Sequence, residues 1–291
     1  MNAADTKGFR WGVERRLEFV EFRLFWEGGV NRSDIVDEFG VSVPQASKDL
    51  ALYQEHAPDN IVYDRSEKRY FASDAFRPRF IELDAAAYLD RLAPRPTATG
   101  AKPEDSAHGA LVADRLPIPQ RRVASNALRA LLEAVRGNRS IEILYQSMSA
   151  ARPEPVWRRV SPHAFASDGL RWHTRAYCHI DQKFKDFILS RCLDCRNIGE
   201  AGSFPRSDDL WNSHFQVILI PNPKLTACQQ GVIAQDYAMM NGRVVVPVRH
   251  AMLYYFSKRL RLDLASSDPR ETPVVVSNRE EFDSALSEAM R

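Results

Sequence analysis

The middle of the chain alternates apolar and polar residues with a period of two, which predicts short β-strands. Residues 157–160, 163–167 and 170–178 show this alternation and are joined by residues that favour turns, and a fourth run, 184–189, follows a polar loop. Strands with such short connections pair with their neighbours in antiparallel fashion. The pattern therefore predicts a small antiparallel sheet.

The third run places two different sets of side chains on the two faces of this sheet, because successive side chains of a strand point in opposite directions. One face receives polar and mostly cationic residues: Arg171, His173, Arg175 and Tyr177. The other face receives Trp172, Thr174, Ala176 and Cys178. We expect this second face to pack and the first to carry the polar groups.

The face that His163 joins depends on the turn before the third run. A two-residue Asp-Gly turn would place His163 on the Trp172 side, whereas a three-residue turn, 167–169, would place it opposite His173. We favour the three-residue turn, because it also sets the small Ala164 beside Trp172. A slip of one residue would reverse the assignment.

Apolar residues at helical spacing predict three helices in the N-terminal part. The first covers residues 11–27, and a short second helix ends at Gly40. Ser42 is a suitable N-cap for the third helix, which extends to about His56. Two helices joined by so tight a turn predict a helix-turn-helix, in which the second helix of the pair contacts DNA bases.

Side chains that can bond to bases or phosphates occupy the outward positions of the third helix. Residues 61–73 then show two apolar runs around a cationic turn, which predicts a β-hairpin wing. Any small three-helix bundle could show the helical pattern alone, but the wing favours DNA binding. The candidate DNA-binding residues are Arg32, Ser42, Gln45, Ser47, Lys48, Arg65, Lys68 and Arg69.

The remaining segments predict a connector and a second mixed region. Residues 94–120 are rich in Pro, Ala, Gly and Thr and lack periodicity, which favours a connector. A helix over 121–136 and a strand over 141–147 lead into the sheet. The C-terminal part alternates strands and helices, at 215–220, 224–241, 243–248, 252–260 and 273–276.

Three motifs of the central region resemble the WYL domain of bacterial transcription regulators. They are RVSPH at 159–163, GLRWHTRAYC at 169–178 and FILSR at 187–191. The naming triplet keeps only its tryptophan, Trp172, since His and Thr stand where Tyr and Leu are usual. The variant is similar to the BrxR and CapW-like subgroup, repressors placed beside phage-defence operons, and the resemblance extends across most of the chain.

The resemblance implies an Sm-like small β-barrel that senses a nucleotide or single-stranded nucleic acid, and a C-terminal extension that pairs two subunits. The expected protein is α+β, with a winged helix-turn-helix over 1–80, a helical and Pro-rich connector over 81–120, a WYL barrel over 121–201 and a dimerisation domain over 202–291. Arginine binds phosphate through two parallel hydrogen bonds, and Tyr and His stack on bases. The implied ligand-binding residues are Tyr145, Ser147, His163, His173, Arg175, Tyr177 and Arg191.

Charge supports an anionic partner for the central region. The net charge is +2, but residues 121–201 hold 14 Lys and Arg against 8 Asp and Glu, whereas residues 1–80 hold 12 against 14. An acidic N-terminal part attracts phosphates weakly, which favours a dimer that sums two modest DNA-binding surfaces. The chain has no membrane-length apolar run and no apolar signal segment, so we expect a cytoplasmic protein without membrane contact.

Metal binding and catalysis find little support. Cys192 and Cys195 form a lone C-x-x-C pair, and a second pair with zinc-site spacing is absent from the sequence, although a redox role stays open. The chain lacks the common hydrolase and phosphate-loop motifs, so we expect no cofactor and no enzyme. Two alternatives remain: an Sm-like RNA-binding module, or a metal-independent RNA-processing enzyme in which His163 and His173 act as acid and base.

We therefore predict a homodimeric, ligand-responsive repressor. Two winged helices would bind an inverted-repeat operator, because the twofold symmetry of the protein is mirrored in its site. A ligand could release the operator only if its affinity differs between DNA-bound and free protein.

Overall fold

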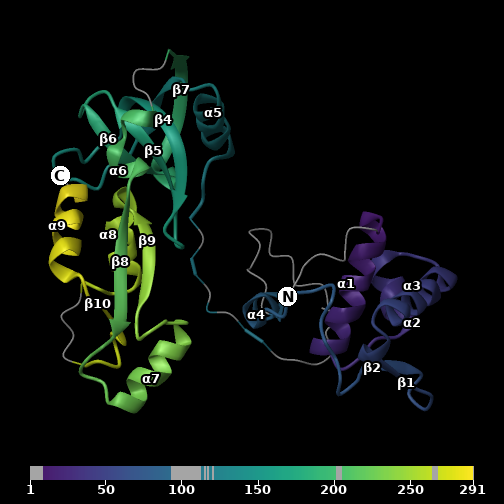
Figure 1. Ribbon diagram of the computed structural model, residues 1–291. Coiled ribbons are helices and arrows are strands. Elements are labelled where there is room, and N and C mark those ends of the chain that lie inside the picture. Colours follow the sequence, from purple (N-terminus) through teal and green to yellow (C-terminus); the bar gives the residue numbers. More distant parts are fainter. Residues whose placement is uncertain are drawn as a thin grey trace. The chain divides into compact units, whose positions relative to one another are not determined.

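The computed structural model divides into two compact units, Met1–Pro117 and Ile118–Arg291 (Figure 1). Most of the connector predicted over 81–120 lies outside the described residues. Within the described parts of the chain, no helix combines the length and apolar character required to cross a membrane. The described residues are 9–92, 113–114, 116, 118–119, 121–200, 205–263 and 268–290.

The described residues of the first unit form the three predicted helices and the predicted hairpin, followed by a short helix at the start of the connector. The side chains of Asn31 and Asp34 form a capping box that starts the second helix, and the Ser42 hydroxyl caps the third. Gly40 ends the second helix in the left-handed conformation, which glycine adopts without strain. The bounds are α1 (Trp11–Trp26), α2 (Arg32–Phe39), α3 (Val43–His56), η1 (Pro58–Asn60), β1 (Ile61–Asp64), β2 (Arg69–Ala72) and α4 (Ala85–Leu92).

The hairpin of β1 and β2 is joined to the helices through its second strand. Tyr70 exchanges two backbone hydrogen bonds with Val30, which lies between α1 and α2. Gly29 must lack a side chain here, because a Cβ atom would lie 2.5 Å from the carbonyl oxygen of Tyr70. The hairpin is therefore held close to the turn that precedes α2.

Helices α1 and α3 share a core and a buried carboxylate. The apolar side chains that build this core are Leu17, Val20, Leu24, Ile35, Ala46, Leu50 and Tyr53. Glu21 is fully buried, and it accepts hydrogen bonds from the hydroxyl of Tyr53 and from the backbone N–H groups of Arg79, Phe80 and Ile81. The segment that leaves the hairpin is thus tied to α1.

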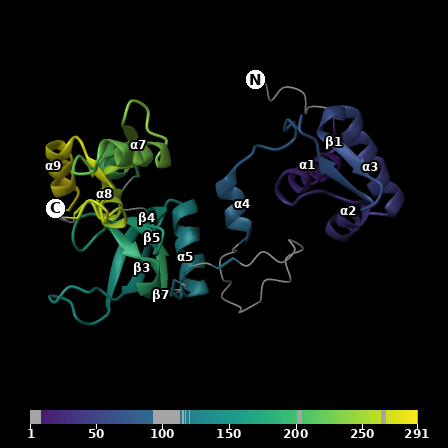
Figure 2. The same ribbon diagram turned by 90° about the horizontal axis from the view of Figure 1, so that it is seen from below.

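The second unit begins with helix α5 (Ser125–Arg136) and a five-stranded antiparallel sheet. Its strand order is β6-β5-β4-β3-β7, and α5 covers one face (Figures 1 and 2). Among the described residues the edge strands β6 and β7 do not pair, so the sheet is open and the expected closed Sm-like barrel is not confirmed. The strands are β3 (Ser140–Tyr145), β4 (Val156–Ser167), β5 (Trp172–Cys178), β6 (Lys183–Ile188) and β7 (Cys192–Gly199), with a 3₁₀ turn η2 (Leu189–Arg191) before β7.

Both predicted registers of the β4–β5 hairpin are wrong. Ser167 pairs with Trp172 and Ala166 with His173, so the turn contains four residues, 168–171, and a β-bulge at His163 shifts the pairing. The physical cause lies in Asp168. Its carboxylate accepts the backbone N–H groups of Leu170 and Arg171 at 2.9 and 2.8 Å and so stabilises a longer turn than the Asp-Gly pair suggests.

The C-terminal part of this unit is a three-stranded sheet, in the order β10-β8-β9, and α7, α8 and α9 contact its outer and central strands. Its core joins Val217 and Leu219 of the central strand to Leu253 and Phe282 of the helices. The sequence analysis did not predict β7 or the last helix, α9. The elements are η3 (Pro205–Ser207), α6 (Asp209–Asn212), β8 (His214–Pro221), α7 (Ala227–Asp236), β9 (Val244–Arg249), η4 (His250–Met252), α8 (Leu253–Arg259), β10 (Val274–Val276) and α9 (Arg279–Met290).

Candidate functional site

The outward face of α3 carries three of the predicted DNA-binding residues. Lys48 is exposed, whereas Gln45 and Ser47 are half-buried. The amide of Gln45 donates to Asp49 at 3.0 Å, and Asp49 also receives two hydrogen bonds from Arg16, at 2.6 and 3.2 Å. The Arg16–Asp49 ion pair therefore orients Gln45 on the helix surface.

Two serines predicted to bind DNA are used within α3 itself. The Ser42 hydroxyl accepts the backbone N–H of Gln45 at 3.4 Å, and the Ser47 hydroxyl donates to the carbonyl of Val43 at 3.0 Å. Ser42 thus stabilises the N-terminus of the helix that carries Lys48.

The predicted wing separates into an exposed tip and an internal base. Arg65 and Lys68 are exposed in the turn between β1 and β2, and Arg32 is exposed at the first turn of α2. Arg69 instead donates to the carbonyl of Gly29 at 2.7 Å and lies 3.7 Å from Asp34. Arg69 therefore ties the hairpin to the turn before α2.

The polar face predicted for β5 exists, but it is buried. The side chains of His163, His173 and Arg175 are 4%, 0% and 5% exposed. Ala176 and Cys178 point to the opposite face and join the core under α5, as the alternation predicts. Trp172, expected to pack, is 56% exposed.

Asp208 binds two residues of this polar face and comes from outside the five-stranded sheet. Arg175 donates from Nε to Oδ2 at 2.7 Å and from Nη2 to Oδ1 at 3.0 Å, and His163 Nε2 lies 3.0 Å from Oδ2. Burial raises the pKa of Asp208, but the hydrogen bonds from His163 and Arg175 outweigh burial and bring the pKa to about 2. The carboxylate is therefore ionised at neutral pH.

Asp186 and Tyr255 form a second contact between the sheet and the C-terminal helices. Asp186 on β6 lies 3.4 Å from Arg175 and accepts the hydroxyl of Tyr255, from α8, at 3.3 Å. Burial raises the pKa of Asp186 and also that of Tyr255. Arg175 is thus shared between two carboxylates.

His173 is held by Asp168 and by an aromatic ring. Its Nε2 lies 3.2 Å from Asp168, which also pairs with Arg171 at 2.7 Å, and its ring packs on Tyr255 with centroids 4.6 Å apart. Burial lowers the pKa of His173, so the ring is neutral at neutral pH. Among the described residues, Nδ1 of His173 has no hydrogen-bond partner.

Of the other predicted ligand-binding residues, Tyr177 adjoins this group, since its ring and that of His163 both pack against Phe184, whereas Tyr145 lies in the core under α5. Tyr145 packs against Phe187 under α5, with centroids 5.0 Å apart, and its hydroxyl accepts the backbone N–H of Ile188 at 3.3 Å. Ser147 accepts a backbone hydrogen bond from Ser149, and Tyr177 packs against Phe184. Arg191 interacts with the Tyr145 hydroxyl. The seven predicted residues therefore lie on both faces of the sheet and do not converge on one cleft.

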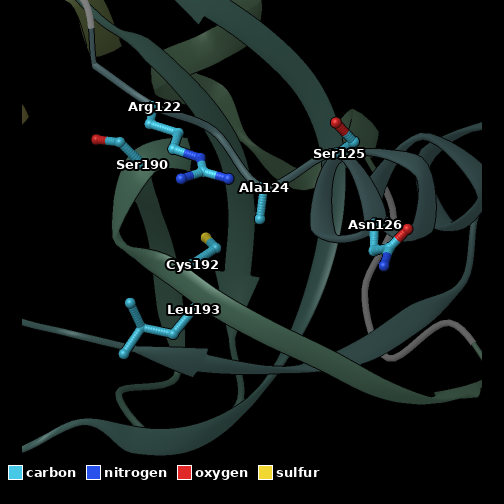
Figure 3. Close-up of a pocket in the computed structure, with 7 residues that line it drawn as sticks. All are labelled: Arg122, Ala124, Ser125, Asn126, Ser190, Cys192 and Leu193. Carbon is cyan, nitrogen blue, oxygen red and sulfur yellow. The ribbon is translucent and has the colours of Figure 1, made fainter.

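Two of the cavities in the second unit are lined by residues named in the sequence analysis. One, of about 500 Å³, is lined by Arg175, Lys183, Lys185, Asp208 and Tyr255, among others. The other, of about 430 Å³, lies between the N-terminus of α5 and the start of β7, and Figure 3 shows Arg122 extending over it in the direction of Cys192. The first cavity gives access to the Arg175 network.

Burial keeps both cysteines of the C-x-x-C pair protonated at neutral pH. Burial raises the pKa of Cys192 to about 12 and that of Cys195 to about 11. The described residues contain no group of three or more His, Cys, Asp or Glu side chains that could hold a metal ion.

The sequence analysis missed Asp168, Asp186, Asp208 and Tyr255 as partners of the predicted residues. Asp208 precedes Asp209 and Leu210 as a typical helix N-cap, and it does cap α6 by accepting the backbone N–H of Trp211. That local signal explains the cap and gives no hint of a bond to Arg175.

Three family models match the chain. They describe the BrxR transcriptional regulator winged helix-turn-helix domain at residues 12–94, the WYL domain at 126–196 and the BrxR transcriptional regulator C-terminal dimerization domain at 214–282. The fold and these matches define a DNA-binding transcription regulator with an N-terminal winged helix-turn-helix, a central WYL domain and a C-terminal dimerisation domain.

Relatives that align along nearly the whole chain identify its family. The DNA-binding transcriptional repressor CapW of Escherichia coli (strain KTE188) is 36% identical over 289 residues, 97% of this chain and 94% of the relative. The same repressor of Stenotrophomonas maltophilia is 40% identical over 286 residues, again 97% and 94%. The chain belongs to the CapW family of DNA-binding transcriptional repressors. It is a regulator and not an enzyme, and the predicted family is confirmed.

A solved structure, the proteasome accessory factor B/C (PafBC) of Arthrobacter aurescens, is 20% identical and covers 96% of this chain and 48% of that chain, with a TM-score of 0.25.

Proposed function

We propose that this protein is a homodimeric repressor of a phage-defence operon, which binds an inverted-repeat operator and releases it when the WYL domain binds a nucleotide or single-stranded nucleic acid. The observation that carries the proposal is the likeness along the whole chain to DNA-binding repressors, together with an exposed Lys48 on α3. The protein acts in the cytoplasm.

The operator is read by α3 and held by the wing. Gln45 and Lys48 contact bases or phosphates from α3, and Arg32, Arg65 and Lys68 contact phosphates on either side. Ser42, Ser47 and Arg69 act by positioning, since their polar atoms bond within the protein.

The C-terminal domain pairs two subunits through its exposed apolar surface. Helix α7 has no buried residue, and Val232, Met240 and Val245 are 54%, 79% and 47% exposed. Apolar surface of this kind is covered by a partner in stable assemblies, and a second copy of the same chain supplies it with twofold symmetry.

The ligand enters the cavity at Arg175. Three cations, Arg175, Lys183 and Lys185, line this cavity beside four carboxylates, and Lys185 pairs with Asp181 at 2.9 Å. The group suited to an anion is therefore the guanidinium of Arg175, which can bind a phosphate through two hydrogen bonds. Ligand and operator then oppose each other with equal coupling free energy, because binding linkage is reciprocal.

The test is a selection of duplex fragments from the source genome with the purified full chain, followed by mobility-shift titration. We expect a palindromic fragment to be enriched, and two subunits to bind each site. Lys48→Ala should lose that fragment and remain dimeric by light scattering. Enrichment of single-stranded RNA in place of any duplex would overturn the repressor and favour the RNA-binding alternative.

A further inference from the structure

The polar face of the WYL sheet is closed by a carboxylate that the WYL domain does not supply. The family model of that domain ends at residue 196 and the C-terminal domain begins at 214, and Asp208 lies between them. Asp208 is 1% exposed, although it belongs to the short segment that joins two domains.

The contacts of Asp208 are those that a ligand phosphate would make. Its two oxygens accept from Nε and Nη2 of Arg175 in a side-on pair and from Nε2 of His163. Such a fork of donors binds carboxylate and phosphate oxygens alike. A ligand phosphate can therefore reach these donors only in exchange for Asp208.

Resting on the ligand sensing proposed above, we propose that Asp208 is an internal competitor that occupies the phosphate position of the ligand site and is displaced when a phosphorylated ligand binds. A phosphate monoester carries more negative charge and more acceptor oxygens than a carboxylate, so it can replace Asp208 at Arg175. Only molecules in which Asp208 has left Arg175 can bind the ligand. The apparent affinity is therefore the intrinsic affinity multiplied by the fraction of such molecules.

Displacement of Asp208 would affect the C-terminal domain through helix α6. Asp208 caps this helix by accepting the backbone N–H of Trp211 at 3.2 Å. Arg249 on β9 donates to the carbonyl of Trp211 and lies over its ring at 4.7 Å. The exchange at Arg175 thus loosens the WYL sheet from the domain that pairs the subunits.

The test measures binding of a fluorescent single-stranded trinucleotide with a 5′-phosphate to the full-length protein by anisotropy. Asp208→Asn removes the charge but keeps a residue that caps helices well. The matched control is Asp194→Asn, an exposed carboxylate of β7 that does not line this cavity and whose substitution changes the net charge equally. We expect Asp208→Asn to bind the probe about tenfold more tightly than the wild type, and Asp194→Asn to change little.

A second variant covers the case in which Asp208→Asn fails to fold. Tyr255→Phe removes only the hydroxyl that binds Asp186 at 3.3 Å and keeps the ring on His173, so it loosens the same interface mildly. It should bind the probe a few-fold more tightly. In the wild type, the probe should speed hydrogen–deuterium exchange in α6 and slow it in β5.

The outcomes separate the two proposals. If the wild type and Asp208→Asn bind the probe equally well, or if Asp194→Asn gains as much affinity, the competitor role is overturned and ligand sensing stands. If Asp208→Asn binds more tightly but operator affinity never changes with probe, the competitor role stands and the proposed ligand response fails. If no variant binds the probe, both are overturned.

Discussion

The outward face of α3 and the polar face of β5 were both expected to bind nucleic acid, but they differ in their exposure to solvent. Lys48 on α3 is exposed, whereas Arg175 on β5 is 5% exposed and bound to two carboxylates. Helical spacing placed Lys48 on the outward face of α3, and alternation placed His173 and Arg175 on one face of β5. Neither pattern indicates that Asp208 and Tyr255, which are 33 and 80 positions beyond Arg175, cover the β5 face.

The largest effect should come from Arg175→Ala, which tests whether the β5 face is closed. The substitution leaves Asp208 and Asp186 buried without their main partner, and breaking a buried ion pair in this way costs about 3–5 kcal/mol. The free energy of unfolding of the second unit, from urea titration, measures the loss. Arg171→Ala, whose side chain is 28% exposed, serves as control and should cost far less. A loss below about 1 kcal/mol for Arg175→Ala would show that the face is open in solution.

Acid should weaken the second unit through the same carboxylates. The pKa values of Asp208 and Asp168 are lowered to about 2 in the folded protein, so both groups stabilise it above pH about 4. This stabilisation disappears as pH falls from about 4 toward 2, and it amounts to roughly 2 kcal/mol for Asp208. Thermal unfolding between pH 6 and pH 3 measures the change. In Asp208→Asn the acid dependence should be shallower, and an unchanged slope would contradict the assignment.

Lys48→Ala tests the open face and should have a smaller effect. Loss of one phosphate contact weakens operator binding by about 1 kcal/mol and reduces the slope of log affinity against log salt concentration by about 1. A mobility-shift titration at several salt concentrations measures both. Lys224→Ala removes the same charge from an exposed position in the second unit and should leave both unchanged.

The smallest expected effects come from substitutions in the hairpin, where a residue at the tip and a residue at the base should affect different properties. Lys68→Ala should reduce operator affinity by only about 0.5 kcal/mol, since an exposed cation in water makes a weak contact. Arg69→Ala should instead lower the free energy of unfolding of the first unit by about 1 kcal/mol, because it removes the hydrogen bond to Gly29. If Lys68→Ala reduces thermal stability as much as Arg69→Ala does, this distinction is wrong.

The first unit could be predicted from sequence because its signals are local. The Ser42 cap, the left-handed Gly40 and the helical spacing of Leu17, Val20 and Leu24 each act within a few residues. The last helix, α9, also carried such a signal, since Phe282 and Ala285 lie one turn apart and are buried.

The second unit was harder to predict because long-range contacts decide it. One error had a local cause: the carboxylate of Asp168 binds the backbone of Leu170 and Arg171 and stabilises a four-residue turn where a shorter one was predicted. The other errors arose from contacts between residues far apart in the sequence. Strand β7 contains the C-x-x-C pair, which the sequence suggested only as a possible metal or redox site. In the structure this segment is the edge strand that pairs with β3 and completes the sheet. Coverage of the polar face required knowledge of where Asp208 and Tyr255 fold, and neither residue has a periodic signal that reports it.

The four hydrogen-bond donors gathered by Glu21 have a mechanical consequence. They fasten the point where the chain departs from the winged helix to the helix that underlies α3, through Tyr53 and the backbone of residues 79–81. A pull exerted on the chain beyond residue 81 acts first on these four hydrogen bonds and not on the hairpin. The backbone bonds between Tyr70 and Val30, which hold the hairpin beside α2, are therefore protected from such a force.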